Sequence, residues 1–461
     1  MSVRHGSTAR LRASWKLGKQ EFDTEPFDVN TNGELIVREG NYQYNLHELL
    51  ERFGSPLEIV FPFIIERRLE IITDAFRNAI RAEKYRGKFS YHYPMKVNQN
   101  REFILPLLTE GANMEAGSVN ELRLIQRLWE QREFSSQVKV LCNGPKTAPY
   151  LTLISELKQS GLEIVPIVED LGELDLLKSF RGQIGIRVNL DTKVHSHWDN
   201  KFDRFGITPQ ELLALDRLKN FTILHYHLGS QMMHADDLVS ALKAAMALYV
   251  KLQAKHPHLD TIDVGGGFAV NYGKTTLYTA RTIARRMVHF LRRAAEAAQV
   301  RPPNIITEWG RAVVAPGQVT LYQVVAAKPI PSGTAKWWYI IDGSFMNDLL
   351  DTWAIHQRWH VVPVVHANAK RFTRAWLAGM SCDSDDKYTA GGDAVRLPRL
   401  EDLDGGERLS LAFFDTGAYQ DALASHHCLL SSPAKIIAQN GEVKVIRPRE
   451  TAEDVGKLFG W

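Results

Sequence analysis

Apolar and polar positions alternate in two distinct ways between about residues 60 and 311. Short apolar or β-branched runs are typical of buried strands, and the longer stretches between them carry apolar residues at helical spacing. The predicted strands are Phe89–Lys96, Asn113–Ala116, Val138–Cys142, Glu163–Val168, Gln183–Val188, Thr222–Leu228, Thr261–Val264 and Ile305–Glu308. Helices are predicted between them, for example at Val119–Arg132, Tyr150–Ser160, Ala235–Lys255 and Thr279–Ala298.

Eight strands that alternate with helices predict a closed (β/α)8 barrel, a fold that usually needs about 250 residues. An open, doubly wound sheet is the alternative, but it would require a switch in strand order and usually has fewer strands. The fold class expected for this part of the chain is therefore α/β, with a TIM-like barrel.

The pattern changes after Arg311, where strand-like runs are separated by Gly- and Pro-rich turns and helical spacing is scarce. The runs are Val313–Ala326, Trp337–Ile341, Trp359–Val365, Leu409–Phe414 and Val443–Ile446, and a strand and hairpin at Glu34–Asn45 are expected to join them. We therefore expect a flexible basic arm at 1–20, a segment joining the β domain at 21–60, the barrel at 61–314 and a mostly β domain at 315–461.

Charge and cysteine content narrow the class of protein. The net charge of +3 is small for 461 residues and gives no support for a nucleic-acid partner. No run of about 18 apolar residues is present, so neither a transmembrane helix nor a membrane partner is expected. Residues 1–20 are basic but lack the apolar core of a signal peptide. Three cysteines without a CxxC pair predict neither a disulfide framework nor a zinc site, so we expect no metal and a reducing, cytoplasmic setting.

Candidate catalytic residues gather at the carboxyl ends of the predicted strands, where barrel enzymes place their active sites. In chain order these ends carry Lys96, Glu115, His227, the Gly265-Gly266-Gly267 turn, Glu308 and Arg311. A glycine turn after the seventh strand can bring bare backbone amides close to an anion such as phosphate. Each element alone is common, since rim lysines are usually solvated, histidines are usually structural and a Glu–Arg pair is usually a surface ion pair. Their succession on one face of a barrel predicts an active site.

Several segments resemble those of biosynthetic arginine decarboxylases, which belong to the fold-type III enzymes that use pyridoxal 5′-phosphate (PLP), with the ornithine and diaminopimelate decarboxylases. They are Tyr91-His92-Tyr93-Pro94-Met95-Lys96-Val97-Asn98-Gln99-Asn100, His227-Leu228-Gly229-Ser230, Gly265-Gly266-Gly267, Glu308-Trp309-Gly310-Arg311, Ser381-Cys382-Asp383-Ser384-Asp385 and Gly417-Ala418-Tyr419-Gln420. The resemblance extends from about residue 35 to 430. It implies an alanine-racemase-like fold, PLP as the cofactor, and decarboxylation of a basic L-amino acid. Arginine, giving agmatine for polyamine biosynthesis, or a modified guanidino amino acid is the substrate that it most directly implies.

The resemblance also implies roles for the residues at the strand ends. Lys96 would carry PLP, since a lysine amine is a nucleophile once it is deprotonated. Glu308 would hold the proton on the pyridine nitrogen, His227 would stack on the ring, and Glu115 would lie near the ring face. The phosphate would be held by Ser230, Gly266, Gly267, Gly310, Arg311 and Tyr419. Ser118 either lines the pocket or caps the next helix, because Ser118-Val119-Asn120-Glu121 has the pattern of a capping box.

Residues after the barrel complete the expected site. Cys382 is the predicted acid that returns a proton to Cα, and its polar Cys-Asp-Ser-Asp setting predicts an exposed thiol. In the family this loop reaches into the partner subunit's site, which implies a homodimer with shared active sites, or a higher oligomer. Asp383 would contact the distal cation of the substrate. Asp348 and Asp351 either add to that contact or are solvated acids, and Trp353 and Trp359 either line the pocket or fill the core.

Other functions stay open at this point. Decarboxylation of lysine or ornithine is the second hypothesis, and diaminopimelate is disfavoured because enzymes for that substrate typically have Cys-Glu where this chain has Cys382-Asp383. An amino-acid racemase would need a second proton carrier facing Lys96. The fourth hypothesis is a PLP-binding regulatory homologue that has lost catalysis. The presence of Lys96, Glu308 and Cys382 argues against it.

Overall fold

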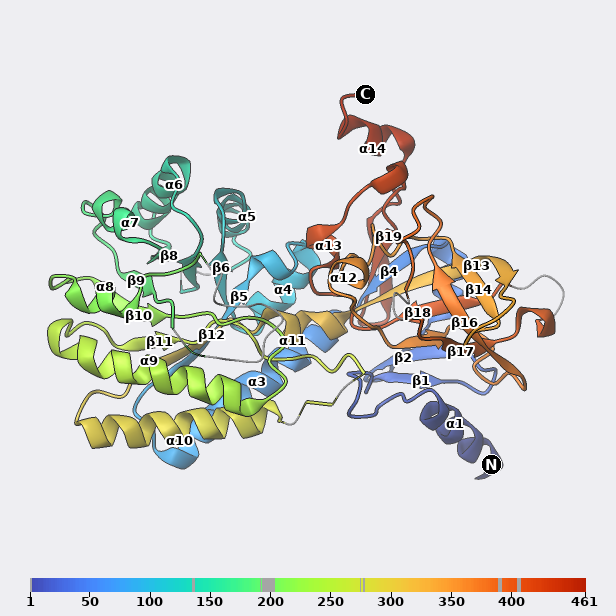
Figure 1. Cartoon of the computed structure of the whole chain (residues 1–461), viewed down its shortest axis with the longest axis horizontal. Helices are drawn as coiled ribbons and strands as arrows, with labels where there is room; N and C mark the ends of the chain where they lie inside the picture. The colour runs from blue at the N-terminus through green and yellow to red at the C-terminus, as the bar shows by residue number, and fades with distance from the viewer. Residues whose placement is uncertain are drawn as a thin grey trace. The chain divides into compact units, whose positions relative to one another are not determined.

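The computed structural model describes residues 2–134, 137–190, 192, 204–273, 275–276, 278–388, 392–403 and 408–461, with side chains from Thr8 onward. The chain forms two compact units, which are coloured by residue number in Figure 1. One unit comprises Glu66–Val270 and Thr276–Val313, and the other comprises Met1–Ile65, Asn271–Thr275 and Val314–Trp461. None of the helices in the described ranges is long and apolar enough to cross a membrane.

The first unit is built around a closed parallel barrel, as predicted, and not around an open sheet. Its strands are β5 (Phe89–Pro94), β6 (Asn113–Ala116), β7 (Lys139–Cys142), β8 (Glu163–Val168), β9 (Ile184–Arg187), β10 (Phe221–His225), β11 (Thr261–Asp263) and β12 (Asn304–Thr307). The order around the barrel is β10-β11-β12-β5-β6-β7-β8-β9. Strand β12 pairs with β5, so the last strand in the sequence lies beside the first.

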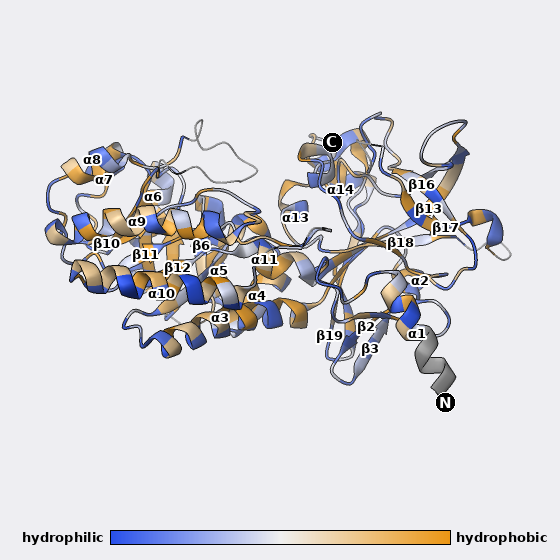
Figure 2. Ribbon diagram, turned by 60° about the horizontal axis from the view of Figure 1, so that its bottom comes forward, coloured by the Kyte–Doolittle hydropathy of each residue, from blue (hydrophilic) through white to orange (hydrophobic). Residues whose placement is uncertain are grey.

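Helices accompany the barrel strands: α3 (Pro62–Glu83), α4 (Arg101–Thr109), α5 (Val119–Glu130), α6 (Ala148–Gln159), α7 (Leu171–Leu176), α8 (Pro209–Ala214), α9 (Ala235–Lys255), α10 (Ala280–Ala298) and α11 (Gly310–Val314). In α10 the buried residues Ile283, Met287 and Leu291 recur at helical spacing, and Figure 2 shows hydrophilic and hydrophobic positions alternating along the helix. The apolar stripe identified in the sequence is therefore the face that α10 buries.

The second unit is mostly β. Its small sheet has the order β1 (Phe27–Val29), β2 (Leu35–Glu39) and β3 (Tyr42–Asn45), which includes the predicted hairpin. The larger sheet follows the order β17 (Val395–Pro398), β16 (Phe372–Ala378), β14 (Trp337–Ile341), β13 (Gln318–Pro329), β4 (Leu57–Val60), β19 (Ala434–Gln439) and β20 (Glu442–Arg447), with β15 (Val361–Pro363) paired to β18 (Ser410–Phe413) and β18 to β13. The helices are α1 (Ser2–Ser14), α2 (Leu46–Phe53), α12 (Asp351–Ala354), α13 (Gln420–Leu423) and α14 (Ala452–Lys457).

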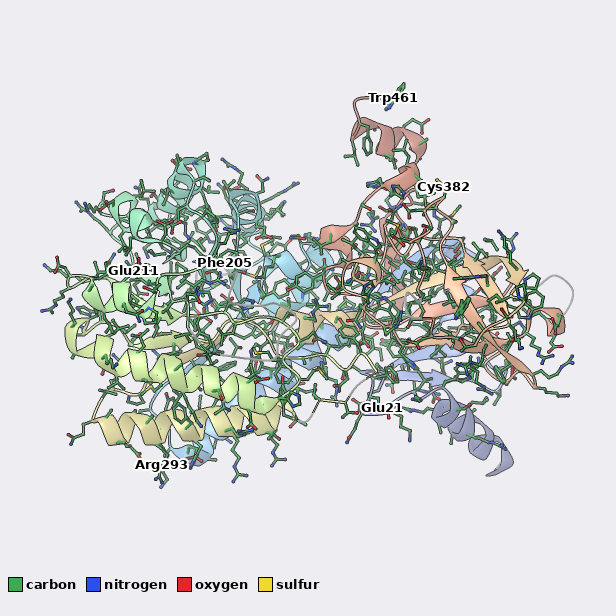
Figure 3. All side chains as sticks on the ribbon, viewed as in Figure 1. Glu21, Phe205, Glu211, Arg293, Cys382 and Trp461 are labelled. Atoms are coloured by element: carbon green, nitrogen blue, oxygen red, sulfur yellow. The ribbon has the colours of Figure 1, made fainter. Side chains whose placement is uncertain are left out.

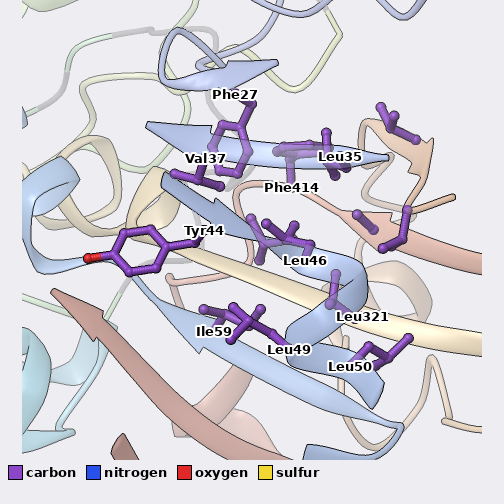
Figure 4. Packing of buried hydrophobic residues seen from close by; sticks show 14 of the residues in the cluster. Phe27, Leu35, Val37, Tyr44, Leu46, Leu49, Leu50, Ile59, Leu321 and Phe414 are labelled. Carbon is purple, nitrogen blue, oxygen red and sulfur yellow. The ribbon is translucent and has the colours of Figure 1, made fainter. Parts of the chain in front are cut away.

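Segments from both ends of the sequence build one core in this unit. Phe27, Leu46, Ile59, Leu321 and Phe414 are among its buried residues, and Figure 4 shows them packed together. Burial of side chains from residues 15–64 against those from 319–438 explains why the N-terminal segment belongs to the C-terminal domain.

Two features differ from the sequence-based expectation. The first 20 residues are not simply an arm, because they begin with helix α1, and Trp15 beyond it is buried and donates from its indole Nε1 to the carbonyl of Ala367 at 2.8 Å. The strand expected from Val313 starts only at Gln318, because Gly310–Val314 is helical and Ala315–Gly317 forms a 3-10 turn. Strands β1, β4, β16, β17 and β19 were not predicted.

Candidate active site

Lys96 lies one turn beyond the first barrel strand. Strand β5 ends at Pro94, and Met95–Val97 forms a 3-10 turn that buries Met95 and Val97 but leaves Lys96 exposed. The turn is held by the Tyr93 hydroxyl, which donates to the carbonyl of Asn98 at 2.8 Å. The local fold therefore fixes the backbone of the lysine, and its charge acts on Glu308, Glu115 and His227.

Glu308 follows strand β12 and is 5% exposed. The amide Nδ2 of Asn143 donates to its Oε1 at 3.1 Å, and Nε2 of His225 lies 3.7 Å from its Oε2. Burial by itself would raise the pKa of this carboxyl, but His225 and Lys96 outweigh burial and leave the pKa well below its usual range. Glu308 is therefore a buried carboxylate that stays ionised.

Two neighbouring carboxyls are protonated in response. Burial and the charge of Glu308 raise the pKa of Asp263 well above its usual range, although the amide of Gly265 donates to its Oδ1 at 2.9 Å. The same two causes, in the same order, raise the pKa of Glu115 to about 8. Like charges at short range cannot all ionise in a low-dielectric site, so the negative charge is concentrated on Glu308.

His227 is held as a neutral, oriented ring. The amide of Gly266 donates to its Nδ1 at 2.9 Å, which makes Nδ1 an acceptor and puts the ring proton on Nε2. Burial lowers the pKa of His227 well below its usual range, and Lys96 and Arg187 lower it further. A Cβ at Gly266 would lie 2.8 Å from Cε1 of His227, so the ring packs directly on the glycine turn.

The segments after strands β10, β11 and β12 supply the predicted phosphate-binding residues of the barrel. Gly267 has φ +108°, and its carbonyl accepts from the amide of Met232 at 3.0 Å, so the turn requires glycine there. A Cβ at Gly310 would lie 2.7 Å from Val97, so this residue packs on the turn that carries Lys96. Arg311, in the first turn of α11, is 9% exposed, and Ser230 is half-buried in the segment that follows β10.

The other predicted site residues belong to the β unit. Cys382 is exposed, as its polar setting predicts, and hydrogen bonding to the thiol of Cys428 raises its pKa. The carboxylate of Asp383 lies 3.3 Å from Nε2 of His427. Tyr419 immediately precedes α13 with φ 69°.

Residues in the segment around α12 are largely enclosed. Asp348 is 7% exposed and its Oδ2 accepts from the amide of Ser344 at 2.9 Å and from the Tyr322 hydroxyl at 3.3 Å, so the expectation of a solvated acid is wrong. Asp351 is also buried, with its amide donating to Gln420 at 3.1 Å. Trp359 is a core residue and Trp353 is exposed.

Ser118 caps helix α5, because its hydroxyl accepts from the amide of Glu121 at 3.2 Å. The carboxylate of Glu121 accepts in turn from the amide of Gly117, at 2.7 Å, and not from that of Ser118. The prediction that Ser118 caps α5 is confirmed. The bond from the Glu121 side chain back to the backbone goes to the residue before the cap, Gly117, and not to the cap itself.

Sequence reasoning missed the residues that surround Glu308. His225, Asp263 and Asn143 lie at or just after the carboxyl ends of β10, β11 and β7, the same signal that identified Lys96 and Glu308. Arg187 ends β9 and lies 3.3 Å from Glu169. His225, Asp263 and Glu308 each offer a ligand atom within 4.8 Å of the others, so a metal is geometrically compatible. However, Oε1 of Glu308 already accepts from the amide Nδ2 of Asn143 at 3.1 Å.

The raised pKa of Glu115 predicts a pH-dependent stability. In the cofactor-free protein the folded state holds this proton up to about pH 8, whereas the unfolded chain releases it near about pH 4.3. The stability that this proton contributes is therefore present below the unfolded pKa and is lost as pH rises through the folded pKa. We expect Glu115→Gln to raise the melting temperature relative to wild type more at about pH 9 than at about pH 5.

The matched control is Glu130→Gln, on the exposed side of α5, for which thermal melts should show the same difference from wild type at both pH values. A Glu115→Gln difference that does not change with pH would contradict the assignment of a protonated Glu115.

The barrel matches a known family model. The model described as pyridoxal-dependent decarboxylase, pyridoxal binding domain, matches residues 71–315. The biosynthetic arginine decarboxylase of Rhodopirellula baltica is 30% identical, over 94% of this chain and 88% of the relative. That of Bacteroides thetaiotaomicron is 28% identical, over 88% and 84%. Arginine decarboxylase 2 of Arabidopsis thaliana is 25% identical, over 83% and 69%.

Solved structures show the same fold. The biosynthetic arginine decarboxylase SpeA from Campylobacter jejuni superposes with a TM-score of 0.84 at 22% identity, covering 96% of this chain and 91% of that one. Diaminopimelate decarboxylase from M. jannaschii superposes with a TM-score of 0.80 at 22% identity, covering 94% and 97%. The barrel and separate β unit confirm the expected alanine-racemase-like fold. The chain therefore belongs to the pyridoxal-dependent decarboxylase family and is a PLP-dependent carboxy-lyase.

Proposed function

We propose that the protein decarboxylates L-arginine to agmatine and CO2. The observation that carries the chemistry is the ionised, buried Glu308, which follows β12, the strand paired with the one that precedes Lys96. Support for the substrate comes from the relatives named arginine decarboxylases, which match most of this chain and most of their own length. Agmatine can be converted into a diamine by removal of its guanidino carbon. The proposed reaction therefore suits polyamine biosynthesis.

The residues of the barrel fit PLP. Glu308 is a carboxylate kept ionised away from water, which suits an N–H of a pyridinium, and Gly266 leaves a surface that a Cβ would fill. When bound, PLP supplies an electron sink for the pair of electrons left on Cα as CO2 departs. Lys96 would hold the cofactor covalently through its amine. A neutral His227 would cover the ring without adding a positive charge beside it.

The remaining cofactor contacts follow the predicted assignment. The phosphate would be bound by Ser230, Gly266, Gly267, Gly310, Arg311 and Tyr419, through backbone amides and the guanidinium. Glu115 would lie at the ring face as a carboxyl with a raised pKa, so it would not compete with Glu308 for positive charge.

Cys382 would return the proton to Cα. An acid must be protonated before it acts, and hydrogen bonding to Cys428 raises the pKa of Cys382 and so favours its thiol form. Asp383 would bind the guanidinium of arginine, since a carboxylate and a guanidinium can share two parallel hydrogen bonds. Asp351 would support that contact. Asp348 is left out because groups of its own unit already enclose it.

The function is tested by supplying the PLP-loaded protein with L-arginine, L-lysine, L-ornithine and diaminopimelate. We expect CO2 and agmatine from arginine at a kcat/KM at least tenfold above that for the other amino acids, and no turnover by Lys96→Ala. If lysine or ornithine were turned over faster than arginine, that amino acid would be the substrate instead of arginine. Loss of Cα chirality without CO2 would instead indicate a racemase, and absence of both reactions would indicate a non-catalytic PLP protein.

Gly266→Ala tests the ring-packing surface. A new Cβ 2.8 Å from His227 must displace the imidazole, and the hydrogen bond to Nδ1 would be lost with it. We expect PLP affinity to fall by about tenfold or more, measured by absorbance titration of the cofactor-free protein.

Gly117→Ala is the matched control, because a Cβ there would lie 3.6 Å from Glu121, an ordinary contact. Unchanged PLP affinity in Gly266→Ala would contradict the proposed position of His227 against the ring.

We also propose a cytoplasmic homodimer in which Cys382 of one subunit serves the Lys96 site of its partner. The family resemblance and the exposure of Cys382 support shared sites, and three free cysteines suit a reducing compartment. Lys96→Ala and Cys382→Ala proteins, each nearly inactive, should recover part of the wild-type rate when mixed and allowed to exchange subunits. Active sites completed within one chain would give no recovery.

A further inference from the structure

Cys382 and Cys428 are separated by 46 positions in the sequence, yet their Sγ atoms lie 3.4 Å apart. Both side chains are exposed, whereas the third cysteine, Cys142, is buried in the barrel. Figure 3 labels Cys382 in the β unit. A disulfide has an S–S distance of about 2.0 Å, so the two sulfur atoms need to approach by only about 1.4 Å to bond.

One loop of the β unit holds the segment that carries Cys382. The carboxylate of Asp386, which is 3% exposed, accepts from the amide of Phe345 at 2.7 Å and from the amide of Ser381 at 3.1 Å. The amide of Met380 donates to the carbonyl of Gly343 at 2.9 Å. These bonds fasten the residues next to Cys382 to the loop at 343–347.

The same loop holds the segment that carries Cys428. The side chain of Asn347, which is 2% exposed, donates from Nδ2 to the carbonyl of His427 at 3.0 Å and accepts at Oδ1 from the amide of His427 at 3.1 Å. The amide of Ser425 donates to the carbonyl of Asn347 at 3.4 Å. The backbone segments that carry the two thiols are therefore both hydrogen-bonded to the loop at 343–347 or to Asp386, which binds it. These bonds bring the two segments, and with them the two thiols, close together.

Two further features mark the segments that carry the thiols: an ion pair between neighbouring residues and a left-handed backbone at Cys428 and Leu429. Asp383 and His427, the residues adjacent to the two cysteines, are 3.3 Å apart at Oδ2 and Nε2. Cys428 and Leu429 have φ of 58° and 54°. This is the left-handed region of backbone conformation, which residues other than glycine rarely adopt. Such strain persists only where the surroundings impose it, and it often accompanies a functional position.

A metal is the other ligand that two cysteines could share. Within the described ranges, the one group of three or more His, Cys, Asp or Glu donors close enough for a metal is His225, Asp263 and Glu308, which contains neither thiol. Two sulfur atoms without further converging donors suit a covalent S–S bond better than a metal centre.

We propose that Cys382 and Cys428 form a reversible intrachain disulfide when a hydroperoxide oxidises the pair. One thiolate attacks the peroxide, the O–O bond breaks, and the sulfur becomes a sulfenic acid while water or an alcohol leaves. The second thiolate then attacks the sulfenic sulfur and expels a second water, so two thiols lose two electrons and two protons to the peroxide. The bond occupies the sulfur that the proposed function assigns as the acid, and this consequence alone rests on that function.

The bond is tested on the PLP-loaded protein of 461 residues, treated with hydrogen peroxide under native conditions, then alkylated and digested without reductant. Mass spectrometry should find the peptides of Cys382 and Cys428 linked, with Cys142 still a thiol, and a non-reducing gel should show the product at monomer mass. Cys428→Ser, a change at an exposed residue, should yield no linked peptide. Absence of the linked peptide in the wild type, or only interchain links, would overturn the inference.

Activity provides the second readout. The wild type should lose CO2 release in proportion to the bonded fraction and regain it with dithiothreitol. Cys428→Ser lacks the resolving thiol, so its Cys382 should pass to the sulfinic acid, which dithiothreitol does not reduce. Disulfide formation with full activity retained would uphold the bond and overturn the role of Cys382 as the acid, which distinguishes failure of the two ideas.

Discussion

A single buried negative charge organises the candidate active site. Glu308 stays ionised because His225 and Lys96 outweigh the cost of burial, and Asn143 donates to the carboxylate. Burial and the charge of Glu308 raise the pKa of the carboxyls of Asp263 and Glu115. A cationic ring bound in this site would have one charged partner, Glu308, in a fixed position. Such electrostatic preorganisation stabilises the positive charge without reorganisation of solvent.

Closure of the barrel creates that arrangement. Because β12 pairs with β5, the end of the last strand carries Glu308 to the side of the turn that carries Lys96, although the two residues are far apart in the sequence. Close approach at this seam depends on Gly310, where a Cβ would meet Val97 and Pro94. The next turn, at Gly265–Gly267, then sets the orientation of His227 through the amide of Gly266.

The β unit contributes a different kind of chemistry. Its loop at 343–347 anchors two distant segments and places two thiols within 3.4 Å. A neighbouring buried cluster holds α13, since Lys435 pairs with Asp421 at the start of that helix and with Glu58 in β4 at 3.1 Å. The residues that are predicted to complete the active site thus lie in segments that the β unit anchors by hydrogen bonds, and the pKa of the proposed acid is raised by a second cysteine.

The sequence by itself determined the barrel, its strands to within one or two residues at most ends, and the positions of Lys96, Glu115, His227 and Glu308 at strand ends, because burial and helical periodicity are written in local pattern. A four-residue motif offered a helix cap at Ser118 as one of two alternatives, and the structure shows that cap. Only the tertiary structure decided what surrounds Glu308, because a strand-end residue such as Asp263 or His225 acquires its role from the strand beside it. Likewise, local sequence carries no sign that Cys428 meets Cys382, or that Trp15 packs into the β core. Those pairings join residues that lie 46 positions apart in one case and 352 in the other, so no local periodicity predicts them.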